Sequence, residues 1–584
     1  MKVLLVAINA KFIHSNPAVY FLRDYAFANI SFVDALQNLQ IDVAEYTINQ
    51  QFDEILIGIF KQKPEIIGFS CYIWNISLIQ QLIVELHKVL PKTEIWLGGP
   101  EVSYNSAQVL LDYPQVDLVI RGEGEEPFYR LLQMRLNHDP APISNITYRD
   151  EAGMPRETLT KDLPDLNNIS FPYHDLEVFQ NRIIYYESSR GCPFSCSYCL
   201  SSASEGVRFR DLELVKKELQ YLIDAHVFQV KFVDRTFNCH KERAREIWSF
   251  LQEKDLGYTN FHFEIAADLL EEEDLELLKT LRPGLIQFEI GVQSTNPQTL
   301  EEITRMMDFE RIKQVVGELK AGKNIHQHLD LIAGLPYEDF KCFANSFNDV
   351  YVLEPEQLQL GFLKVLNGSV LAEKAQGYQL VFQSRAPYEV LSTKWLSFEE
   401  ILRLKQVEEM VEVYYNSRQF VNTLRFFVHY FDTPFLMYDA LGDFYDKRSY
   451  VKVNHTRQRR YEILLEFATE HLNQLEFVVE HLNLMDDFQE NLILDYYLRE
   501  NAKKRPGFAG EETVSKEEAN QFYECEVQTF QYLKGYEEFD KRQIRKMTHL
   551  ERIGGKLYLF DYLNKNNWSK DARHYHIDIL GEKT

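Results

Sequence analysis

Three of the chain's seven cysteines, Cys192, Cys196 and Cys199, lie within eight residues in the spacing CxxxCxxC. Thiolates are the usual protein ligands of iron–sulfur clusters. Three thiolates on one loop can hold three irons of a cubane and leave the fourth iron open, so that it can coordinate a small molecule and deliver one electron to it. The alternative is a structural zinc site, which normally takes four ligands from paired CxxC motifs. The next cysteine, Cys239, lies forty residues after Cys199 and is expected to be a small buried residue.

The cysteines follow directly on the first of six predicted strands that alternate with helical patterns. Six βα repeats indicate a partial barrel rather than the closed eight-stranded one, and such barrels carry their active sites at the carboxyl ends of the strands. The predicted strands are Ile183–Glu187, Val230–Val233, Phe261–Ala266, Leu285–Val292, His328–Ile332 and Gln357–Phe362.

This combination resembles the radical S-adenosylmethionine (SAM) superfamily over about residues 182–390: a CxxxCxxC motif with an aromatic residue, Tyr198, before its third cysteine, at the start of a six-repeat βα barrel. The resemblance implies that Cys192, Cys196 and Cys199 are the catalytic ligands of a [4Fe–4S] cluster. It also implies that the open iron binds SAM, and that an electron from the cluster cleaves the sulfonium to give a 5′-deoxyadenosyl radical.

Segments at the ends of the later barrel strands resemble elements that contact SAM in this superfamily. Asp234 and Thr236 follow the second strand, where the resemblance implies contact with the methionine amine, although the usual Gly-Gly-Glu does not occur there. Glu264, on the third strand, is predicted either to contact the ribose or to be a structural carboxylate. The remaining predicted contacts are Gln293 and Ser294, at the end of the fourth strand, and Gly334, in a Gly-Leu-Pro turn after the fifth.

Residues 1–137 alternate apolar, β-rich runs with helical stretches, which predicts a Rossmann-like parallel sheet covered on both faces. Ligands of such sheets bind at the carboxyl ends of the strands. No G-x-G-x-x-G follows the first strand, which argues against a dinucleotide site. The predicted strands are Lys2–Ile8, Val43–Ile48, Ile66–Tyr72, Glu94–Leu97 and Asp117–Ile120.

A Rossmann-like domain ahead of such a barrel resembles the cobalamin-binding branch of the superfamily. The matching positions are small residues after the third, fourth and fifth strands, where the backbone must approach a flat macrocycle closely: Ser70, Gly98, Gly99 and Gly122. The alternative is a Rossmann fold whose glycine-rich turns hold no cofactor.

The family's cobalt-ligating Asp-x-His-x-x-Gly does not occur after the first strand. His14 lies in that loop without the flanking Asp and Gly, so we expect it to be a hydrogen-bonding residue and the lower face of the cobalt to have no protein ligand. A related branch, the methylthiotransferases of transfer RNA, carries three further cysteines in its first domain. This chain has Cys71 alone there, which argues against that branch.

Residues 138–181 are irregular and are predicted to be a linker, with a hairpin turn at Asp150–Gly153. The radical SAM core is expected over 182–388, and residues 389–584 indicate a third, acidic and α-rich domain. This domain could cap the barrel and exclude water. The expected fold is therefore α/β, with a Rossmann-like domain, a (β/α)6 partial barrel and a mainly helical carboxy-terminal domain, as in cobalamin-type radical SAM proteins with an uncharacterised tail.

Acidic residues outnumber basic ones, 88 against 63, and the formal net charge of −25 opposes binding to nucleic acid. No apolar run approaches the roughly 20 residues that span a bilayer. Met1–Ala10 is predicted to be a buried strand rather than a signal peptide. We expect a cytoplasmic protein in a reducing compartment.

The predicted function is reductive cleavage of SAM, with cobalamin, for methylation of an unactivated position on a small molecule or peptide. The first alternative is a radical SAM oxidoreductase or cyclase without methyl transfer, and the second is a non-catalytic iron–sulfur protein. The predicted chemistry requires an electron donor such as flavodoxin or ferredoxin.

Overall fold

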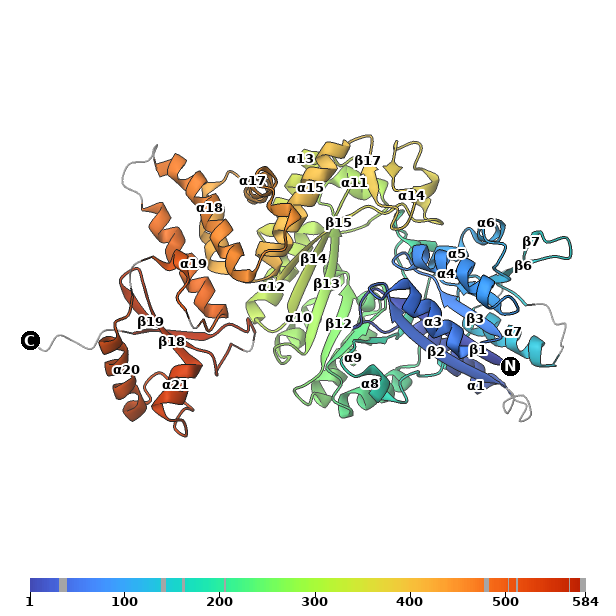
Figure 1. Ribbon diagram of the computed structural model, residues 1–584, viewed down its shortest axis with the longest axis horizontal. Helices are drawn as coiled ribbons and strands as arrows, with labels where there is room; N and C mark the ends of the chain where they lie inside the picture. Colours follow the sequence, from blue (N-terminus) through green and yellow to red (C-terminus); the bar gives the residue numbers. More distant parts are fainter. Residues whose placement is uncertain are drawn as a thin grey trace, which may run out of the picture. The chain divides into compact units, whose positions relative to one another are not determined.

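The computed structural model describes residues 1–30, 39–137, 143–159, 163–203, 206–476, 483–502, 504–510, 513–566 and 568–577 (Figure 1). The chain divides into two compact units. The first consists of Met1–His326, Ile332–Asp339 and Gly361–Ser397. The second consists of Gln327–Leu331, Phe340–Leu360 and the chain from Phe398 onward.

The first unit begins with a sheet of seven strands in the order β2-β1-β3-β4-β5-β6-β7. The first five strands in the chain are parallel and confirm the predicted Rossmann-like sheet. Strand β1, second in this order, contains an unbroken apolar run, Val3–Ile8, that is buried because helices flank the sheet (Figure 1). The five strands are β1 (Lys2–Asn9), β2 (Gln40–Thr47), β3 (Ile66–Ser70), β4 (Glu94–Gly98) and β5 (Leu118–Ile120).

The helices of this sheet pack in pairs, α1 with α7 and α3 with α4. Asn16 caps α1 by accepting a hydrogen bond from Ala18 N, and Pro17 starts the helix. The helices are α1 (Pro17–Asn29), α3 (Phe52–Gln62), α4 (Ile76–Val89), α5 (Pro100–Ser103), α6 (Ser106–Asp112) and α7 (Glu125–Asn137).

An antiparallel hairpin, β6 (Ile146–Arg149) and β7 (Pro155–Glu157), completes the first sheet by pairing with β5. Its turn lies at the predicted position, since Gly153 N donates to Asp150 O and Gly153 has a left-handed φ of 78°. Part of the segment that was predicted to be a linker therefore extends the sheet.

A second sheet forms the partial barrel, in the order β15-β14-β13-β12-β11-β8, as the βα alternation predicts. In β13 the apolar residues alternate with polar ones, and Phe288 packs against Trp248 of helix α9 (Lys241–Lys254). The apolar residues thus face the helices, and the polar ones face the inside of the barrel. The strands are β8 (Ile184–Tyr186), β11 (Gln229–Phe232), β12 (Asn260–Ile265), β13 (Ile286–Gln293), β14 (His326–Ala333) and β15 (Gln357–Phe362).

The barrel helices alternate with these strands along the chain, and a short antiparallel pair, β9 (Ser189–Gly191) and β10 (Val207–Phe209), follows β8. The helices are α8 (Leu212–Asp224), α9 (Lys241–Lys254), α10 (Glu272–Lys279), α11 (Pro297–Glu302), α12 (Phe309–Gly322) and α13 (Phe340–Tyr351). Beyond β15 come α14 (Val370–Glu373) and the pair β16 (Val381–Phe382) and β17 (Val390–Ser392).

The second unit is mainly helical, as predicted, and many of its tyrosines and phenylalanines are core residues. Tyr438, for example, is fully buried against Phe347 and Tyr351. Its helices are α15 (Phe398–Met410), which continues as a π-helix (Val411–Asn416), α16 (Val421–Phe427), α17 (Pro434–Lys447), α18 (Arg457–Glu476), α19 (Leu484–Arg499), α20 (Lys516–Thr529) and α21 (Lys541–Met547).

This unit also contains an antiparallel sheet that the sequence analysis did not predict. Its strands are β18 (Thr548–Ile553), β19 (Lys556–Asp561) and β20 (Arg573–Ile577). Throughout the described ranges, no helix combines the length and the apolar character needed to cross a membrane.

Candidate active site

The three cysteines lie on the loop after β9, and all three are free thiols. Gly191, next to Cys192, has a left-handed φ of 102°. A Cβ at this position would lie 2.1 Å from Gly206 O, so the close approach of β9 and β10 requires glycine. Cys196 is buried, whereas Cys192 and Cys199 are partly exposed. The donor set, three free thiols on one loop, fits the cluster that the spacing predicts.

Cys192 and Cys196 contact different parts of the barrel. Cys192 Sγ lies 3.6 Å from Thr236 Oγ1, after β11, and Cys196 Sγ lies 3.6 Å from Arg305 Nη1. The first of these contacts places the predicted residue Thr236 beside the cysteine loop. Within the described part of the chain, no three His, Cys, Asp or Glu side chains are grouped as ligands of a single metal ion.

Arg305 is a site residue that the sequence analysis missed. Its Nη1 atom contacts both Cys196 Sγ and, at 3.4 Å, Tyr198 Oη, while its Nη2 atom donates to Gly291 O on β13. The side chain thus places a positive charge next to the sulfur of Cys196. Arg305 lies more than 100 residues after Cys196, so no local sequence pattern predicts this contact.

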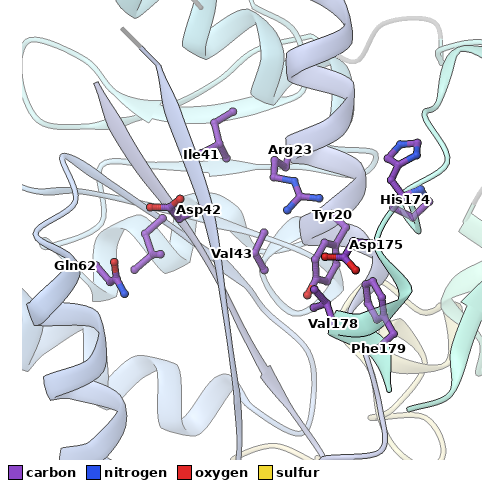
Figure 2. Close-up of a pocket in the computed structure, with 12 residues that line it drawn as sticks. Tyr20, Arg23, Ile41, Asp42, Val43, Gln62, His174, Asp175, Val178 and Phe179 are labelled. Atoms are coloured by element: carbon purple, nitrogen blue, oxygen red, sulfur yellow. The ribbon is translucent and has the colours of Figure 1, made fainter. Parts of the chain in front are cut away.

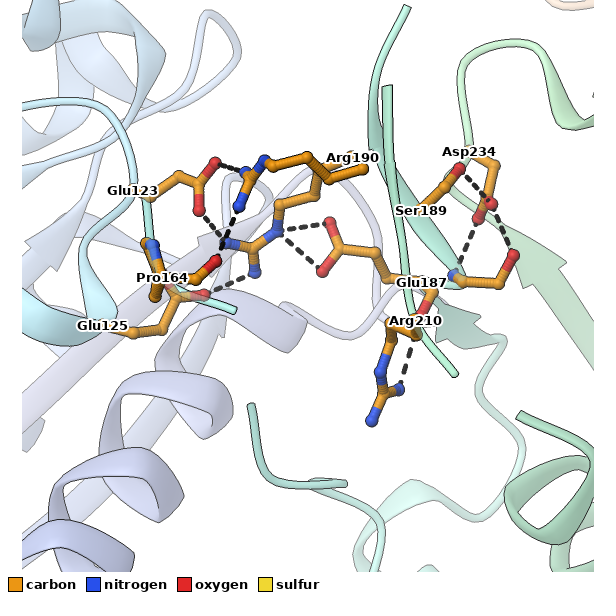
Figure 3. Close-up of polar contacts among 10 residues, drawn as sticks. Glu123, Glu125, Pro164, Glu187, Ser189, Arg190, Arg210 and Asp234 are labelled. Atoms are coloured by element: carbon orange, nitrogen blue, oxygen red, sulfur yellow. Dashed lines mark hydrogen bonds and ion pairs between the residues drawn. The ribbon is translucent and has the colours of Figure 1, made fainter. Parts of the chain in front are cut away.

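Asp234 is almost completely buried, and its carboxylate accepts three hydrogen bonds, at 2.9 Å from Ser188 N, at 2.6 Å from Ser188 Oγ and at 2.6 Å from Ser189 Oγ (Figure 3). Burial raises its pKa, although these hydrogen bonds and the charge of Arg243 oppose the rise. Through its hydrogen bonds to Ser188 and Ser189, Asp234 holds the segment that leads into the cysteine loop. Its contact with SAM stays a prediction.

Glu264 projects into the inside of the barrel among charged neighbours. Its Oε1 atom lies 4.0 Å from Lys231 Nζ. The same Nζ atom lies closer to Glu289, at 3.0 Å from Oε2. His262 Nε2 also lies 3.0 Å from Glu289 Oε2. Burial and the charge of Glu289 raise the pKa of Glu264 to about 7. Burial opposes ionisation of Glu289 too, but His262 and Lys231 outweigh it and lower the pKa of Glu289 to about 2.

The predicted SAM contacts at the ends of β13 and β14 lie in constrained turns. Gln293 has a left-handed φ of 73°, an unusual backbone for a residue with a side chain. Ser294 is fully buried and donates to Glu338 Oε1 at 2.6 Å. Gly334 has a φ of 91°, and a Cβ there would lie 2.8 Å from Val390 Cγ1. These positions are structurally specified, and their contacts with SAM remain predictions.

The small residues predicted to hold cobalamin lie at or just beyond the carboxyl ends of β3, β4 and β5. Ser70 Oγ accepts a hydrogen bond from Asn16 Nδ2 at 2.7 Å. A Cβ on Gly98 would make only ordinary contacts, whereas one on Gly99 would lie 2.5 Å from Cys71 O. Gly122 has a φ of 65° and open space where a Cβ would stand. The close approach of the Cys71 backbone thus explains why residue 99 is a glycine, without a ligand. The open space at Gly122, in contrast, fits an approaching ligand.

An aromatic pair that the sequence analysis did not single out follows Ser70. Tyr72 and Trp74 are stacked with their ring centroids 4.4 Å apart, and Trp74 is 43% exposed. The indole Nε1 donates to Ile8 O at the end of β1, which fixes the ring at the carboxyl edge of the sheet. A flat, partly exposed ring at this edge fits the face of a macrocycle.

His14 is engaged with the barrel rather than left free in its loop. Its Nδ1 atom lies 2.6 Å from Tyr185 Oη on β8. Burial, with the charges of Lys11 and Lys231, lowers the pKa of the imidazole. This hydrogen bond agrees with the expected structural role of His14.

A pocket of about 550 Å³ lies elsewhere on the first unit, between α1, β2 and the segment around Asp175 (Figure 2). Its wall includes Ile41, Asp42 and Val43, at the beginning of β2. The pocket is therefore at the amino ends of the parallel strands, away from the carboxyl ends where ligands of such sheets bind. It contains none of the predicted site residues.

Three family models match the chain: the B12 binding domain over residues 18–132, the radical SAM superfamily over 186–350 and a protein of unknown function (DUF4080) over 376–574. The chain therefore contains a B12-binding domain followed by a radical SAM domain, the class that the sequence predicted. These domains imply cobalamin, a [4Fe–4S] cluster and SAM as cofactors.

Similar curated proteins include a cyclase and a methyltransferase. An anaerobic magnesium-protoporphyrin IX monomethyl ester cyclase of Rubrivivax gelatinosus is 26% identical over 341 residues, which cover 56% of this chain and 59% of that protein. The cobalamin-dependent radical SAM methyltransferase TokK of Streptomyces tokunonensis is 26% identical over 345 residues, 54% of this chain and 50% of that one. The chain thus spans little more than half the length of these curated relatives.

A solved structure shows the same fold. The cobalamin-dependent S-adenosylmethionine radical enzyme OxsB, with aqua-cobalamin and S-adenosylmethionine bound, aligns with a TM-score of 0.58 at 16% sequence identity. The alignment covers 85% of this chain and 79% of that one.

Proposed function

We propose that this protein is a cobalamin-dependent radical SAM methyltransferase that acts on an unactivated position of a small molecule or peptide. The observation that carries the proposal is a contact within the first unit. Arg190, two residues before Cys192, pairs with Glu123, in the loop after β5 of the B12-binding domain, and with Glu125, the first residue of α7. The two cofactor domains therefore meet at the cysteine loop, as one shared reaction requires.

The proposed cofactor sites use the residues described above. Cys192, Cys196 and Cys199 would hold the cluster, Thr236 and the turns at Gln293 and Gly334 would line the SAM site, and Ser70, Gly98, Gly122 and Trp74 would hold the corrin. When bound, the cluster and SAM supply a radical that removes a hydrogen atom from carbon, and the corrin supplies a methyl group. A small electron-transfer protein, such as a flavodoxin or ferredoxin, would reduce the cluster.

In this proposal the chain itself manages protons inside the barrel. Lys231 and His262 keep the carboxylate of Glu289 charged, whereas Glu264 holds a proton up to a pH of about 7. Neighbouring groups whose pKa values are driven apart are suited to acid and base roles. Glu264 could therefore accept a proton from a polar group of the substrate or hydrogen-bond to it.

The second candidate is a radical SAM oxidoreductase or cyclase without methyl transfer. The similarity to the Rubrivivax gelatinosus protein, whose name is that of a cyclase, favours it. The two candidates share the cluster and SAM and differ in the product. Formation of S-adenosylhomocysteine together with a methylated product supports methyl transfer, whereas 5′-deoxyadenosine without methylated product supports the second candidate.

The first test needs no substrate. The protein is purified anaerobically, reconstituted with iron and sulfide, incubated with hydroxocobalamin and SAM, and reduced with dithionite. We expect iron and sulfide near four per chain, corrin absorption bands that stay with the protein on gel filtration, and reductive cleavage of SAM. The variant Cys196→Ala should lose the cluster and the cleavage, while Cys525→Ala, in the second unit, should keep both. A wild-type protein that retains no corrin would contradict the cobalamin part of the proposal.

A further inference from the structure

Arg190 is the centre of an ion-pair network in the first unit (Figure 3). The side chain is only 15% exposed, and its three nitrogen atoms reach three different carboxylates. Nη1 lies 2.8 Å from Glu123 Oε2, Nη2 lies 2.5 Å from Glu125 Oε1, and Nε lies 2.9 Å from both oxygens of Glu187. A planar guanidinium fork can make these contacts at once, but an ammonium group cannot.

The partners of Arg190 come from separate elements. Glu123 lies in the loop after β5, directly beyond Gly122, Glu125 is the first residue of α7, and Glu187 follows β8 of the barrel. Arg190 itself lies on β9, and Gly191 separates it from Cys192. A single side chain thus joins the loop proposed to hold cobalamin, the first barrel strand and the loop proposed to hold the cluster.

The network contains one more carboxylate than it has arginines. Arg208 of β10 also pairs with Glu123, and it donates to Pro164 O at 2.8 Å. Burial opposes the charge of Glu125, but Arg190 outweighs it and lowers the pKa of this carboxyl. Burial raises the pKa of Glu187, and the charges of Glu125 and Asp234 add to the rise. Removing the charge of Arg190 would therefore leave buried carboxylates facing one another, which is strongly unfavourable.

We propose that Arg190 is a positioning residue that holds the cobalamin loop, Gly122–Glu125, in register with the cysteine loop, and so fixes the distance between the two cofactors. This inference rests on the proposed function, since it concerns how the two cofactors of that function are placed. Arg190 acts through the loops that it joins and does not itself have to touch either cofactor.

The test compares Arg190→Lys with the wild type and with a matched control, Arg210→Lys. Arg210 is also buried and makes a two-pronged pair with a glutamate, Glu218. Its other hydrogen bonds reach the backbone oxygens of Ile169 and Glu187, outside the residues that match the B12 binding domain. Titration with hydroxocobalamin, followed by absorbance, should show affinity about tenfold weaker for Arg190→Lys, the size expected for losing buried, charge-assisted hydrogen bonds. Arg210→Lys should bind hydroxocobalamin as the wild type does.

A spectroscopic measurement separates positioning from general stability. With cobalamin as cobalt(II) and the cluster reduced, the two paramagnetic centres relax one another at a rate set by their separation. Pulsed electron paramagnetic resonance should give one narrow distance in the wild type and in Arg210→Lys, and a broadened one in Arg190→Lys. Glu125→Gln, which keeps the shape of the side chain but removes its charge, should act in the same direction and carries the test if Arg190→Lys does not fold.

The outcomes are distinct. If the wild type binds hydroxocobalamin and the variants at Arg190 and Glu125 match it in affinity and in the cobalt–cluster distance, the positioning role is overturned and the proposed function stands. If Arg210→Lys is affected as strongly as Arg190→Lys, the effect is general destabilisation and the positioning role is again overturned. If the wild type binds no cobalamin, the proposed function fails, and this inference fails with it.

Discussion

Glu264 and Glu289 are register partners on adjacent strands, β12 and β13, yet the pKa values of their carboxyl groups move in opposite directions. Both side chains lie on the inner face of the barrel. Lys231 and His262 both lie 3.0 Å from Glu289 Oε2, whereas Glu264 Oε1 lies 4.0 Å from the same lysine. Near neutral pH one carboxyl is charged and its neighbour is close to its titration midpoint.

This asymmetry predicts a pH-dependent effect of Glu264→Gln on stability. The pKa of Glu264 is about 7 in the folded chain and about 4.3 in an unfolded one, so the folded state holds a proton that the unfolded state releases. The contribution of this carboxyl group to the stability of the folded state is complete below pH 4 and is lost as the pH rises to 7. We expect the variant to match the wild type at pH 4.5 and to be more stable at pH 8, by on the order of 1–3 kcal/mol.

Thermal unfolding at both pH values measures this difference. Glu276→Gln, a change at an exposed position of α10, serves as the control and should show the same offset at both pH values. Equal stability of Glu264→Gln and the wild type at pH 8 would contradict the raised pKa.

The contact between Arg305 and Cys196 predicts an effect on the cluster's reduction potential. A positive charge beside a sulfur ligand favours the reduced, more negative cluster. Arg305→Met should therefore lower the midpoint potential by tens of millivolts, as measured by a redox titration followed by electron paramagnetic resonance. Arg282→Met, which removes a charge paired with Asp255 near the amino end of β13, should leave the potential unchanged. A potential that rises in Arg305→Met would refute the assignment.

Trp74 is predicted to pack against the corrin. Trp74→Ala should weaken hydroxocobalamin binding by about tenfold, because stacking and burial of a large aromatic ring are lost. Trp74→Phe removes the hydrogen bond to Ile8 O. It should nevertheless retain most of the affinity for hydroxocobalamin, because it keeps an aromatic ring. Unchanged binding by Trp74→Ala, measured by absorbance titration, would place the corrin elsewhere.

Gly191→Ala tests the geometry of the cysteine loop. The added methyl group would meet Gly206 O at 2.1 Å, in a left-handed conformation that already disfavours alanine. We expect most of the bound iron to be lost after reconstitution. Gly206→Ala is the matched control, because Gly206 has a similar φ of 70° but open space around its Cβ position, and it should retain the cluster. Full iron content in Gly191→Ala would show that the loop tolerates the clash.

The sequence predicted the parallel part of the fold well. Strands such as β1 and β13 have long apolar or alternating patterns, and every strand predicted for the first sheet and the barrel lies within three residues of its observed bounds. The antiparallel strands β18–β20 were missed, because they follow a long helical pattern and pair with one another rather than with a neighbouring βα unit. The hairpin turn at Asp150 was predicted, but not that its strands extend the first sheet.

The candidate site divides in the same way. The cysteine motif is local, so its residues could be found from spacing alone. Arg305 and Trp74 depend on tertiary contacts, with Cys196 and with Ile8, that no local pattern reports. Asp234 was found as a site residue, but its three hydrogen bonds to the serines before the motif depend on the packing of β8 against β11.

The polar inner face of the barrel also bears on which molecules can enter it. A hydrocarbon would strip water from Lys231, Glu264 and Glu289 without replacing those hydrogen bonds, at a cost of several kcal/mol for each charge. A compound that carries amide, hydroxyl or amino groups would replace them. Libraries of hydrophilic metabolites and short peptides are therefore a better starting point for a substrate search than lipids or other apolar compounds.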